Sequence, residues 1–301
     1  MTGEHAERFT ELRPLLFTIA YEILGSATES DDVLQDSYLR WAEVDLDEVH
    51  DIKAYLASLV TRQSLNALRA GARRREEYVG PWLPEPLLLT EHDPSADVLL
   101  AESVSMAMLV VLETLSPEER AVFVLREVFG FDYDEIAAAV GKSAAAARQV
   151  AHRARNHVQA RRPRYAPADP EESTRVAAEF MTAAAGGDLT TVLSMLAPDV
   201  VWTADGGGKA SAARRPVVGA EKVARVVIGL LRHGAQMPYV RVEMGVCNSS
   251  PAVLLYSADR LEGVFTIEIV DGLITNFYAM RNPDKLAAVA AAREITRGAD
   301  V

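Results

Sequence analysis

A single change in hydrophobic periodicity divides this chain and limits its fold more than any other feature. Up to about residue 165, apolar residues recur at the three- and four-residue spacing of amphipathic helices. Beyond Pro163 and Pro170, two further helical patterns lead into short apolar runs bounded by turn residues, which indicate strands. Asp271-Gly272 separates two of these runs and predicts a hairpin. The pattern therefore predicts an all-helical part followed by an α+β part.

A proline-rich segment interrupts the helical part at residues 78–99. The sequence YVGPWLPEPLLLTEHDPSADV holds four prolines, which lack an amide hydrogen and fix φ, so extended chain is expected there. Its apolar residues Trp82, Leu83 and 87–89 are expected to dock on a neighbouring surface. This segment and the change in pattern near residue 165 together predict four parts. They are a domain at 1–77, a linker at 78–99, a second domain at 100–165 and a third at 166–301.

Residues 117–158 have the layout of a helix-turn-helix unit. Ser116 followed by Pro117 and two acids is typical of a helix start. A short helix from Tyr133 ends at Gly141, which permits a tight turn, and Ser143 is expected to cap the next helix. Small apolar residues along that helix allow close packing on the first: Ala147, Ala151, Ala154 and Val158. An ordinary helical hairpin with an alanine-rich second helix is the alternative.

The charges of the chain are segregated. The net charge is −12, from 31 lysines and arginines against 43 acids, which at first argues against nucleic-acid binding. Residues 52–75 nevertheless carry six bases and no acid, residues 136–168 carry seven bases and no acid, and residues 1–51 hold 13 acids against three bases. Each basic segment is either a solvated helix face or a phosphate-binding surface. The presence of two such segments favours DNA binding. Because the whole chain is acidic, we expect the free protein to bind DNA only weakly.

Simpler features exclude other classes of protein. No run approaches the roughly 20 apolar residues of a membrane span, and the polar N-terminal stretch lacks the apolar segment of a signal peptide, so no membrane contact is expected. Cys247 is the single cysteine, which excludes an internal disulfide and suits a reducing, cytoplasmic location. No cofactor is expected. No metal is expected either, because His152 and His157 have no matching ligands nearby.

Three segments of the helical part are similar to a known family, and they follow one another along the chain in the order found in that family. SPEERAVFVLREVFGFDYDEIAAAVGKSAAAARQVAHRARNHV resembles domain four of the extracytoplasmic-function (ECF) RNA polymerase sigma factors. SDDVLQDSYLRWAE resembles their polymerase-binding helix, and IKAYLASLVTRQSLNALRAGARRR resembles the helix that engages the −10 promoter element. YVGPWLPEP, DGGGK at 205–209 and NPDKL at 282–286 resemble the subgroup with a C-terminal SnoaL-like domain. This implies a multidomain fold: two all-α sigma domains, the second a helix-turn-helix, then an α+β cone-shaped SnoaL-like domain.

The resemblance implies a sigma factor that binds core RNA polymerase, through the β′ clamp helices and the β subunit, and directs it to promoter DNA. The implied polymerase contacts are Asp32, Gln35, Asp36 and Arg40. The implied −10 contacts are Arg62, Asn66, Arg69 and Arg73. The implied −35 contacts are Lys142, Ser143, Arg148, Gln149, His152, Arg153 and Arg155. Arg148 and Gln149 suit bases, because arginine reads guanine and glutamine reads adenine, whereas Lys142, Arg153 and Arg155 suit phosphates.

The C-terminal domain is expected to regulate the sigma domains in cis, through the linker and the glycine-rich loop. The residues implied are Trp82, Leu83, Pro84, Asp205, Gly206, Gly207, Gly208 and Lys209. Lys209 is expected to pair with a linker acid, Glu85 or Glu91. A group of aromatic residues forms either a core or the lining of a cavity for a small-molecule ligand: Phe180, Trp202, Phe265, Phe277 and Tyr278.

Catalysis in this domain is not expected. His233 is predicted near a helix end, and the acids Asp205, Asp259 and Glu268 have no obvious partner. Two other functions stay open. A SnoaL-type isomerase or hydrolase with a DNA-binding appendage requires an Asp/His pair inside the cone. A dimeric, ligand-sensing helix-turn-helix repressor requires neither the basic segment at 52–75 nor the acidic helix that follows Ser30.

Overall fold

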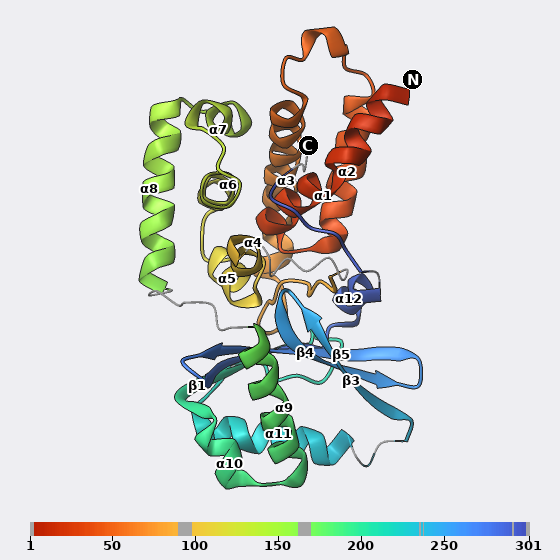
Figure 1. Ribbon diagram of the computed structural model, residues 1–301, viewed down its shortest axis with the longest axis vertical. Helices are drawn as coiled ribbons and strands as arrows, with labels where there is room; N and C mark the ends of the chain where they lie inside the picture. Colours follow the sequence, from red (N-terminus) through yellow and green to blue (C-terminus); the bar gives the residue numbers. More distant parts are fainter. Residues whose placement is uncertain are drawn as a thin grey trace.

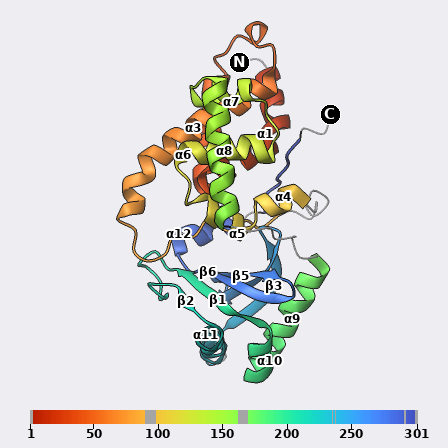
Figure 2. The ribbon, with the colours of Figure 1, turned by 90° about the vertical axis from the view of Figure 1, so that its left-hand side faces the viewer.

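The computed structural model describes residues 3–89, 98–161, 170–234, 236, 238–290 and 292–298. Three layers follow one another along its long axis (Figure 1). The helices of the first 161 residues form one end, a six-stranded sheet lies in the middle, and the helices between residues 170 and 234 form the other end. The perpendicular view shows the same order (Figure 2). The all-helical first part and the α+β second part expected from the periodicity are confirmed.

Three helices make the first bundle: α1 (Gly3–Leu24), α2 (Ala27–Trp41) and α3 (Ile52–Glu76), with a short 3₁₀ turn η1 (Leu46–Glu48) before α3. Every residue of α1 from Leu15 to Leu24 is buried, so α1 is the centre of the bundle. Gly25, with φ of +69°, ends α1, and the Ser26 Oγ accepts a hydrogen bond from the Glu29 amide at 3.1 Å. The helix expected after Ser30 therefore begins earlier, because Ser26 is its cap.

The second helical group contains α4 (Val98–Ser103), α5 (Met106–Leu112), α6 (Pro117–Phe123), the π-helical turn η3 (Val124–Val128), α7 (Tyr133–Val140) and α8 (Ala144–Arg161). Ser116 caps α6 in a reciprocal arrangement with Glu119. Asp132 caps α7, and Gly141 ends it with φ of +72°. The helix-turn-helix expected from the sequence is thus formed by α7 and α8.

The two helical groups share one hydrophobic core. α3 packs directly against α6 and α7, and a single cluster of buried side chains runs from α1–α3 into α5–α8. Leu87 of the linker is buried in the same cluster. Residues 78–89 of the linker have no helix and dock with Leu83 and Leu87 fully covered, as expected. The last two residues of the linker, 98 and 99, already belong to α4, so the helix begins slightly before the expected end of the linker.

The sheet has the strand order β2-β1-β6-β5-β4-β3. Its strands are β1 (Leu196–Asp205), β2 (Val217–Val218), β3 (Val240–Cys247), β4 (Ser250–Ser257), β5 (Arg260–Val270) and β6 (Leu273–Met280). β1 runs parallel to β6, and every other pair is antiparallel. Asp271 and Gly272 both have positive φ in the β5–β6 turn, so the hairpin predicted there is confirmed.

The sheet separates two different surroundings. The helices α9 (Pro170–Gly186), α10 (Leu189–Ser194) and α11 (Ala220–Gly234) cover one face. The other face packs on the linker, on α5, and on α12 (Pro283–Leu286) with the turn η4 (Ala287–Ala290). Because side chains alternate along a strand, neighbours such as Phe277 and Tyr278 lie on opposite faces.

The C-terminal segment 292–298 returns to the first bundle (Figure 1). The amide of Arg293 donates to the Leu88 carbonyl at 2.8 Å, and its guanidinium pairs with Asp31 of α2 at 2.7 Å. The amide of Thr296 donates to the Thr18 Oγ1 of α1 at 3.1 Å. This segment, called the tail below, connects the linker to the first bundle.

Candidate functional site

The helix α8 presents a polar face to solvent. Arg148, Gln149, His152 and Arg153 are exposed on it. The Arg148 guanidinium lies 4.9 Å from the centroid of the Tyr133 ring, so a cation–π contact orients it beside α7. The opposite face is buried and carries the expected apolar stripe: Ala147, Ala151, Ala154 and Val158. Four of the seven residues expected at the −35 element thus share one exposed face.

The cations expected at phosphates are paired with acids of the same helical group. Lys142 lies 2.9 Å from Glu118, Arg153 lies 3.7 Å from Glu119, and Arg155 lies 2.7 Å from Glu127. Arg155 makes the shortest of these three contacts, a hydrogen bond from its guanidinium to the Glu127 carboxylate, which makes it the least suited of the three to a phosphate. Ser143 is the N-cap of α8, with its Oγ accepting a hydrogen bond from the Ala146 amide at 3.2 Å.

The residues expected at the −10 element lie on α3. Arg62, Asn66 and Arg69 are exposed at spacings of four and three, so they share one face. The side chain of Arg73 lies outside the described residues. Arg75, the last base of that segment, turns inward: it pairs with Glu113, donates to the Leu24 carbonyl at 2.9 Å and lies over the Trp82 ring. Arg75 therefore belongs to the contact between the two helical groups.

The helix α2 exposes the residues expected at polymerase. Asp32, Gln35, Asp36 and Arg40 all face solvent. Leu39 lies among them, and 59% of it is exposed. A large apolar side chain at the centre of an exposed polar face is typical of a surface that binds another protein. Sequence reasoning missed Leu39, although its position four residues after Gln35 places it on this face.

Asp205, at the end of β1, is the centre of the contact between the sheet and the linker. It has no exposed surface, and its carboxylate accepts four hydrogen bonds: from the Tyr78 hydroxyl at 2.5 Å, the Leu83 amide at 2.9 Å, the Gly207 amide at 3.0 Å and the Lys285 Nζ at 2.8 Å. The expectation that Asp205 lacks a partner is therefore wrong.

Lys285 of α12 completes this contact. It is 4% exposed, donates to the Leu83 carbonyl at 2.6 Å and lies 3.2 Å from the centroid of the Trp82 ring. Burial lowers the pKa of Lys285, and the charge of Asp205 opposes that shift. Burial and the neighbouring Asp205 raise the pKa of Tyr78.

The glycine-rich loop fits closely beside this contact. A Cβ on Gly206 would lie 2.4 Å from the Ala210 carbonyl oxygen, and one on Gly207 would lie 2.4 Å from the side-chain nitrogen of Asn282. Gly207 and Gly208 also have positive φ, so glycine is required there for space and for conformation. Pro84 is buried in the linker nearby.

The expected pairing of Lys209 with Glu85 is wrong. Lys209 pairs at 2.5 Å with Asp284, and both side chains are more than half exposed. Glu85 points toward the first bundle, where it accepts hydrogen bonds from the Ser26 hydroxyl at 2.8 Å and the Thr28 amide at 3.0 Å. Glu91 lies outside the described residues. The reason is topological: Asp284 begins α12 beside the loop, whereas Glu85 lies on the far side of the linker.

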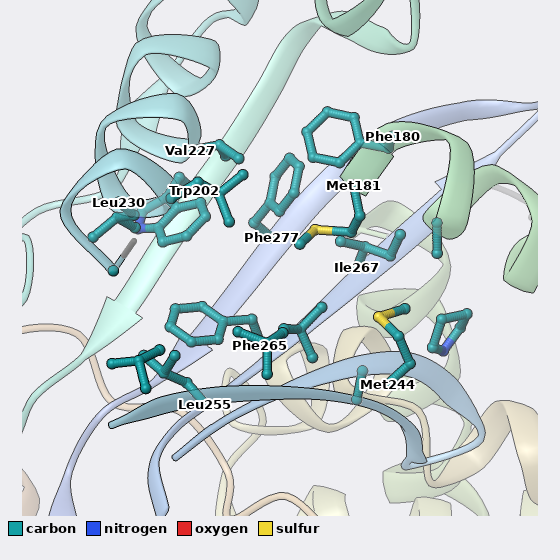
Figure 3. A pocket seen from close by; sticks show the side chains of 18 residues that line it. Phe180, Met181, Trp202, Val227, Leu230, Met244, Leu255, Phe265, Ile267 and Phe277 are labelled. Atoms are coloured by element: carbon teal, nitrogen blue, oxygen red, sulfur yellow. The ribbon is translucent and has the colours of Figure 1, made fainter. Parts of the chain in front are cut away.

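A cavity of about 380 Å³ lies between the sheet and the helices α9 and α11 (Figure 3). Phe180, Trp202, Phe265 and Phe277 line it, so the aromatic residues form a cavity as well as a core. Tyr278 does not line it, because it points to the linker face of the sheet. His233, in the last turn of α11, is exposed and is not among the lining residues.

Comparison with known proteins agrees with this geometry. Residues 8–74 match the family model described as Sigma-70 region 2, and residues 105–158 match Sigma-70, region 4. The chain is 40% identical over 288 residues to the ECF RNA polymerase sigma factor SigJ of Mycobacterium tuberculosis, covering 92% of this chain and 91% of the relative. The chain belongs to the ECF RNA polymerase sigma factors.

Two further similarities support the assignment. A probable ECF RNA polymerase sigma factor, SigI of Mycobacterium tuberculosis, is 32% identical over 283 residues, which is 93% of each chain. The crystal structure of the Mycobacterium tuberculosis SigJ is similar with a TM-score of 0.76 at 33% identity, over 94% of this chain and 99% of that one. These relatives are sigma factors rather than enzymes. A sigma factor binds RNA polymerase and directs transcription initiation.

Two further features of the structure concern membrane-spanning helices and metal-binding clusters of side chains. In the part of the chain that the structure describes, no helix has the length and apolar character needed to cross a membrane. Among the same residues, no three histidine, cysteine, aspartate or glutamate side chains are grouped so that they could hold a metal ion.

Asn248 is an interdomain residue that sequence reasoning missed. From the β3–β4 turn, its side-chain amide donates to the Tyr21 hydroxyl of α1 at 2.7 Å and to the Val104 carbonyl at 2.9 Å, and its oxygen accepts from the Leu87 amide at 2.8 Å. It is fully buried and joins the sheet to α1, the linker and the end of α4. Its sequence context, Asn-Ser between two strands, indicates a turn but not these contacts.

A second missed group joins the two sigma domains. Glu113 accepts hydrogen bonds from Arg75 of α3 and, at 2.5 Å, from Arg120 of α6, which also donates to the Glu22 carbonyl of α1 at 2.8 Å. The Glu22 carboxyl is fully buried and accepts from the Ser103 hydroxyl at 2.7 Å. Burial raises the pKa of Glu22 to about 8, against the smaller lowering effects of Ser103 and Arg120.

Proposed function

We propose that the C-terminal domain of this sigma factor holds the two sigma domains in a closed, inactive arrangement. The division into a domain at 1–77, a linker at 78–99, a domain at 100–165 and a regulatory domain at 166–301 is part of this proposal. The observation that carries it is the packing of α3, with the expected −10 residues, directly against α7 of the helix-turn-helix.

The closed arrangement is too compact to read a promoter. The −10 and −35 elements lie about 25 base pairs apart, which is roughly 85 Å at about 3.4 Å per base pair. The helix α3 has 25 residues, so it is only about 37 Å long at 1.5 Å per residue. Because α3 touches α7 and α7 touches α8, both elements cannot be bound at once until the helical groups separate.

The C-terminal domain stabilises the closed arrangement from three places. Asp205 and Lys285 hold the linker, Asn248 joins the linker to α1 and α4, and the tail pairs Arg293 with Asp31. Since the linker connects the two sigma domains, fixing it restricts how far they can move apart. The regulatory residues expected from sequence, Trp82 to Pro84 and 205–209, lie at or beside the first of these places.

We assign the DNA contacts from exposure and from the hydrogen bonds that each side chain makes within the protein. On α8, Arg148 and Gln149 contact bases of the −35 element, while Arg153 and His152 contact phosphates, as does Lys142 in the turn before α8. Phosphates would replace Glu118 and Glu119 as partners of Lys142 and Arg153. Ser143 and Arg155 act within the protein, as a helix cap and as a bond to η3. On α3, Arg62, Asn66 and Arg69 contact the −10 element, and Arg73 is assigned there from its sequence position alone.

The polymerase-binding face of α2 is accessible in the closed arrangement. Asp32, Gln35, Asp36 and Arg40 surround the exposed Leu39, which suits a contact with the β′ clamp helices; the second sigma domain is assigned to the β subunit. Polymerase can therefore engage α2 first, and the helical groups separate afterwards.

The proposal is tested by energy transfer between dyes on the two helices. Ala70 of α3 and Gln159 of α8 are exposed and outside the proposed contacts, so each is changed to cysteine in the full chain and labelled. The native Cys247 is fully buried, and burial raises the pKa of its thiol to about 12, so it stays unlabelled. Free protein is expected to show high transfer, and its complex with core polymerase and promoter DNA low transfer.

The control is promoter DNA without polymerase, where transfer is expected to stay high. Low transfer in the free protein, or high transfer in a complex that makes transcript, would show that no closed arrangement restrains this sigma factor.

A further inference from the structure

We propose that the cavity of the C-terminal domain binds an uncharged, ring-containing, largely hydrocarbon molecule and does not transform it. The cavity is about 380 Å³ and lies between β3–β6 and the helices α9 and α11. This volume is within the range of roughly 300–1,000 Å³ that holds small-molecule ligands. Binding itself is independent of the closed arrangement, whereas its effect on the sigma domains rests on the function proposed above.

The lining determines the charge of the ligand. Among the described residues that line the cavity, none has an ionisable side chain, and Trp202 alone carries a side-chain N–H group. A carboxylate, sulfonate or ammonium group inside would lose its water without gaining a partner, which is strongly unfavourable. The same lining supplies no general acid or base, so it favours binding over reaction. The ligand is therefore neutral.

The shape of the lining favours a ring system. The Trp202 and Phe277 rings have centroids 5.4 Å apart, Phe180 and Phe277 are also 5.4 Å apart, and Phe265 lies 6.1 Å from Trp202 (Figure 3). These side chains come from different elements and present ring surfaces to one space. Flat or fused rings bury more area against such walls than a flexible chain and lose less entropy on binding.

The mouth of the cavity is apolar and open. Leu230 on α11 is 38% exposed, and Val242 and Met244 on β3 are 49% and 51% exposed. All three line the cavity. Since a neutral apolar ligand would cover part of this surface, binding removes apolar area from water at the mouth as well as inside.

The sheet connects the cavity to the contacts with the linker. Trp202 pairs with Phe277 across β1 and β6, and Asp205 lies three residues further along β1. The opposite face of the same strands packs on the linker and α12. A ligand that moves these strands by a small amount therefore has different affinities for the closed and open arrangements. The difference in its binding free energy sets how far it changes the ratio of closed to open molecules.

The binding test uses two dyes with the same aromatic core and different charge. N-phenyl-1-naphthylamine is neutral, and 1-anilinonaphthalene-8-sulfonate is its anionic counterpart. Titration of the full chain is expected to show fluorescence enhancement with the neutral dye at micromolar concentrations. The anionic dye is expected to bind at least tenfold more weakly. Equal binding of both dyes, or no saturable binding of the neutral dye, would overturn the proposal.

A pair of variants on one strand locates the binding. Met244 lines the cavity and Val246 does not, although both are 51% exposed on the same side of β3. Met244→Trp is expected to fill the mouth and weaken the neutral dye at least tenfold, whereas Val246→Trp is expected to leave it unchanged. Both substitutions are at exposed positions, and thermal unfolding checks their folding. Equal effects of the two variants would refute binding in this cavity.

The effect of the ligand on the sigma domains is measured in a separate experiment. Saturating neutral dye is added to the labelled Ala70→Cys, Gln159→Cys chain, and energy transfer is measured together with polymerase affinity. A change in transfer supports coupling through the sheet. Binding that satisfies the dye and variant tests without any change in transfer would retain the ligand site and overturn its link to the sigma domains.

Discussion

The replacement of Asp205 by asparagine should open this sigma factor. Asp205 has no exposed surface and the side chain of Lys285 is 5% exposed, so their ion pair is shielded from water. Removing one partner of a buried pair costs about 3–5 kcal/mol. Lys285 keeps its bond to the Leu83 carbonyl, and its pKa, already lowered by burial, falls further without Asp205, so the cost stays near the lower end. In the open form both groups reach water, and the cost applies to the closed form alone.

A loss of about 3 kcal/mol corresponds to a shift of about 140-fold in the ratio of closed to open molecules. The apparent affinity for core polymerase should rise by up to this factor, because the fraction of competent molecules limits it. Fluorescence anisotropy of full-length, labelled protein with core polymerase measures the affinity, and run-off transcription measures the yield.

The matched control is Lys209→Ala. It removes an ion pair with Asp284 in which both side chains are more than half exposed, and such pairs contribute about 0–1 kcal/mol. Its polymerase affinity should equal that of the native chain within a few-fold. If Asp205→Asn lowers the melting temperature but leaves polymerase affinity unchanged or weaker, the contact is purely structural and the reasoning fails.

Three further changes have expected outcomes. Burial raises the pKa of Glu22 from an ordinary 4.5 to about 8, so between these pH values the folded state keeps a proton that the unfolded chain releases. The free energy of unfolding is therefore highest below about pH 4.5 and falls as the pH rises to about 8. Glu22→Gln should therefore gain on the native chain by at most about 1.4 kcal/mol per pH unit across that window, and urea unfolding at several pH values that shows a constant difference would contradict this. Arg293→Met breaks an ion pair with Asp31 in which each side chain is about one-quarter exposed. The closed arrangement should lose about 1 kcal/mol of stability, so polymerase affinity should rise only about fivefold. An unchanged affinity would show that the tail has no restraining role. Gln149→Ala should relax the preference for one base pair of the −35 element by about 1–3 kcal/mol, as run-off transcription from a set of single-base promoter variants would show, and a uniform loss over all variants would place Gln149 on the phosphates.

Local patterns in the sequence predicted the elements well. The capping sequences at Ser116 and Ser143, the glycine at 141 and the Asp271-Gly272 turn each act within a few residues, so their effect is readable without the rest of the chain. The extended linker followed from proline chemistry in the same way. The start of α2 was misplaced because Ser26, Thr28 and Ser30 are all suitable caps. Ser26 and Thr28 also bond to Glu85, which lies 59 and 57 residues away, and the local sequence does not show these contacts.

The interdomain contacts were much less predictable. Asn248 and Tyr21 are separated by 227 residues, and nothing near either residue indicates the other. The same holds for Lys285, whose motif was noted while its burial on Asp205 was not. The error at Tyr278 was avoidable, since its neighbour Phe277 lines the cavity and adjacent residues of a strand must face opposite sides.

The docking of the tail on α1 and α2 has a consequence for synthesis of the chain on the ribosome. The last helix of the helix-turn-helix, α8, ends at Arg161, yet Arg293 and Thr296, which bind the first bundle, are made more than 130 residues later. At about 5–20 residues per second, this interval lasts roughly 7–27 s. If the C-terminal domain restrains the sigma domains as proposed, each new molecule passes through a period in which its proposed promoter-reading helices exist without that restraint. On the proposed closed arrangement, nascent chains that meet polymerase in that period are unrestrained, and the rate of translation between residue 161 and the tail sets how long that period lasts.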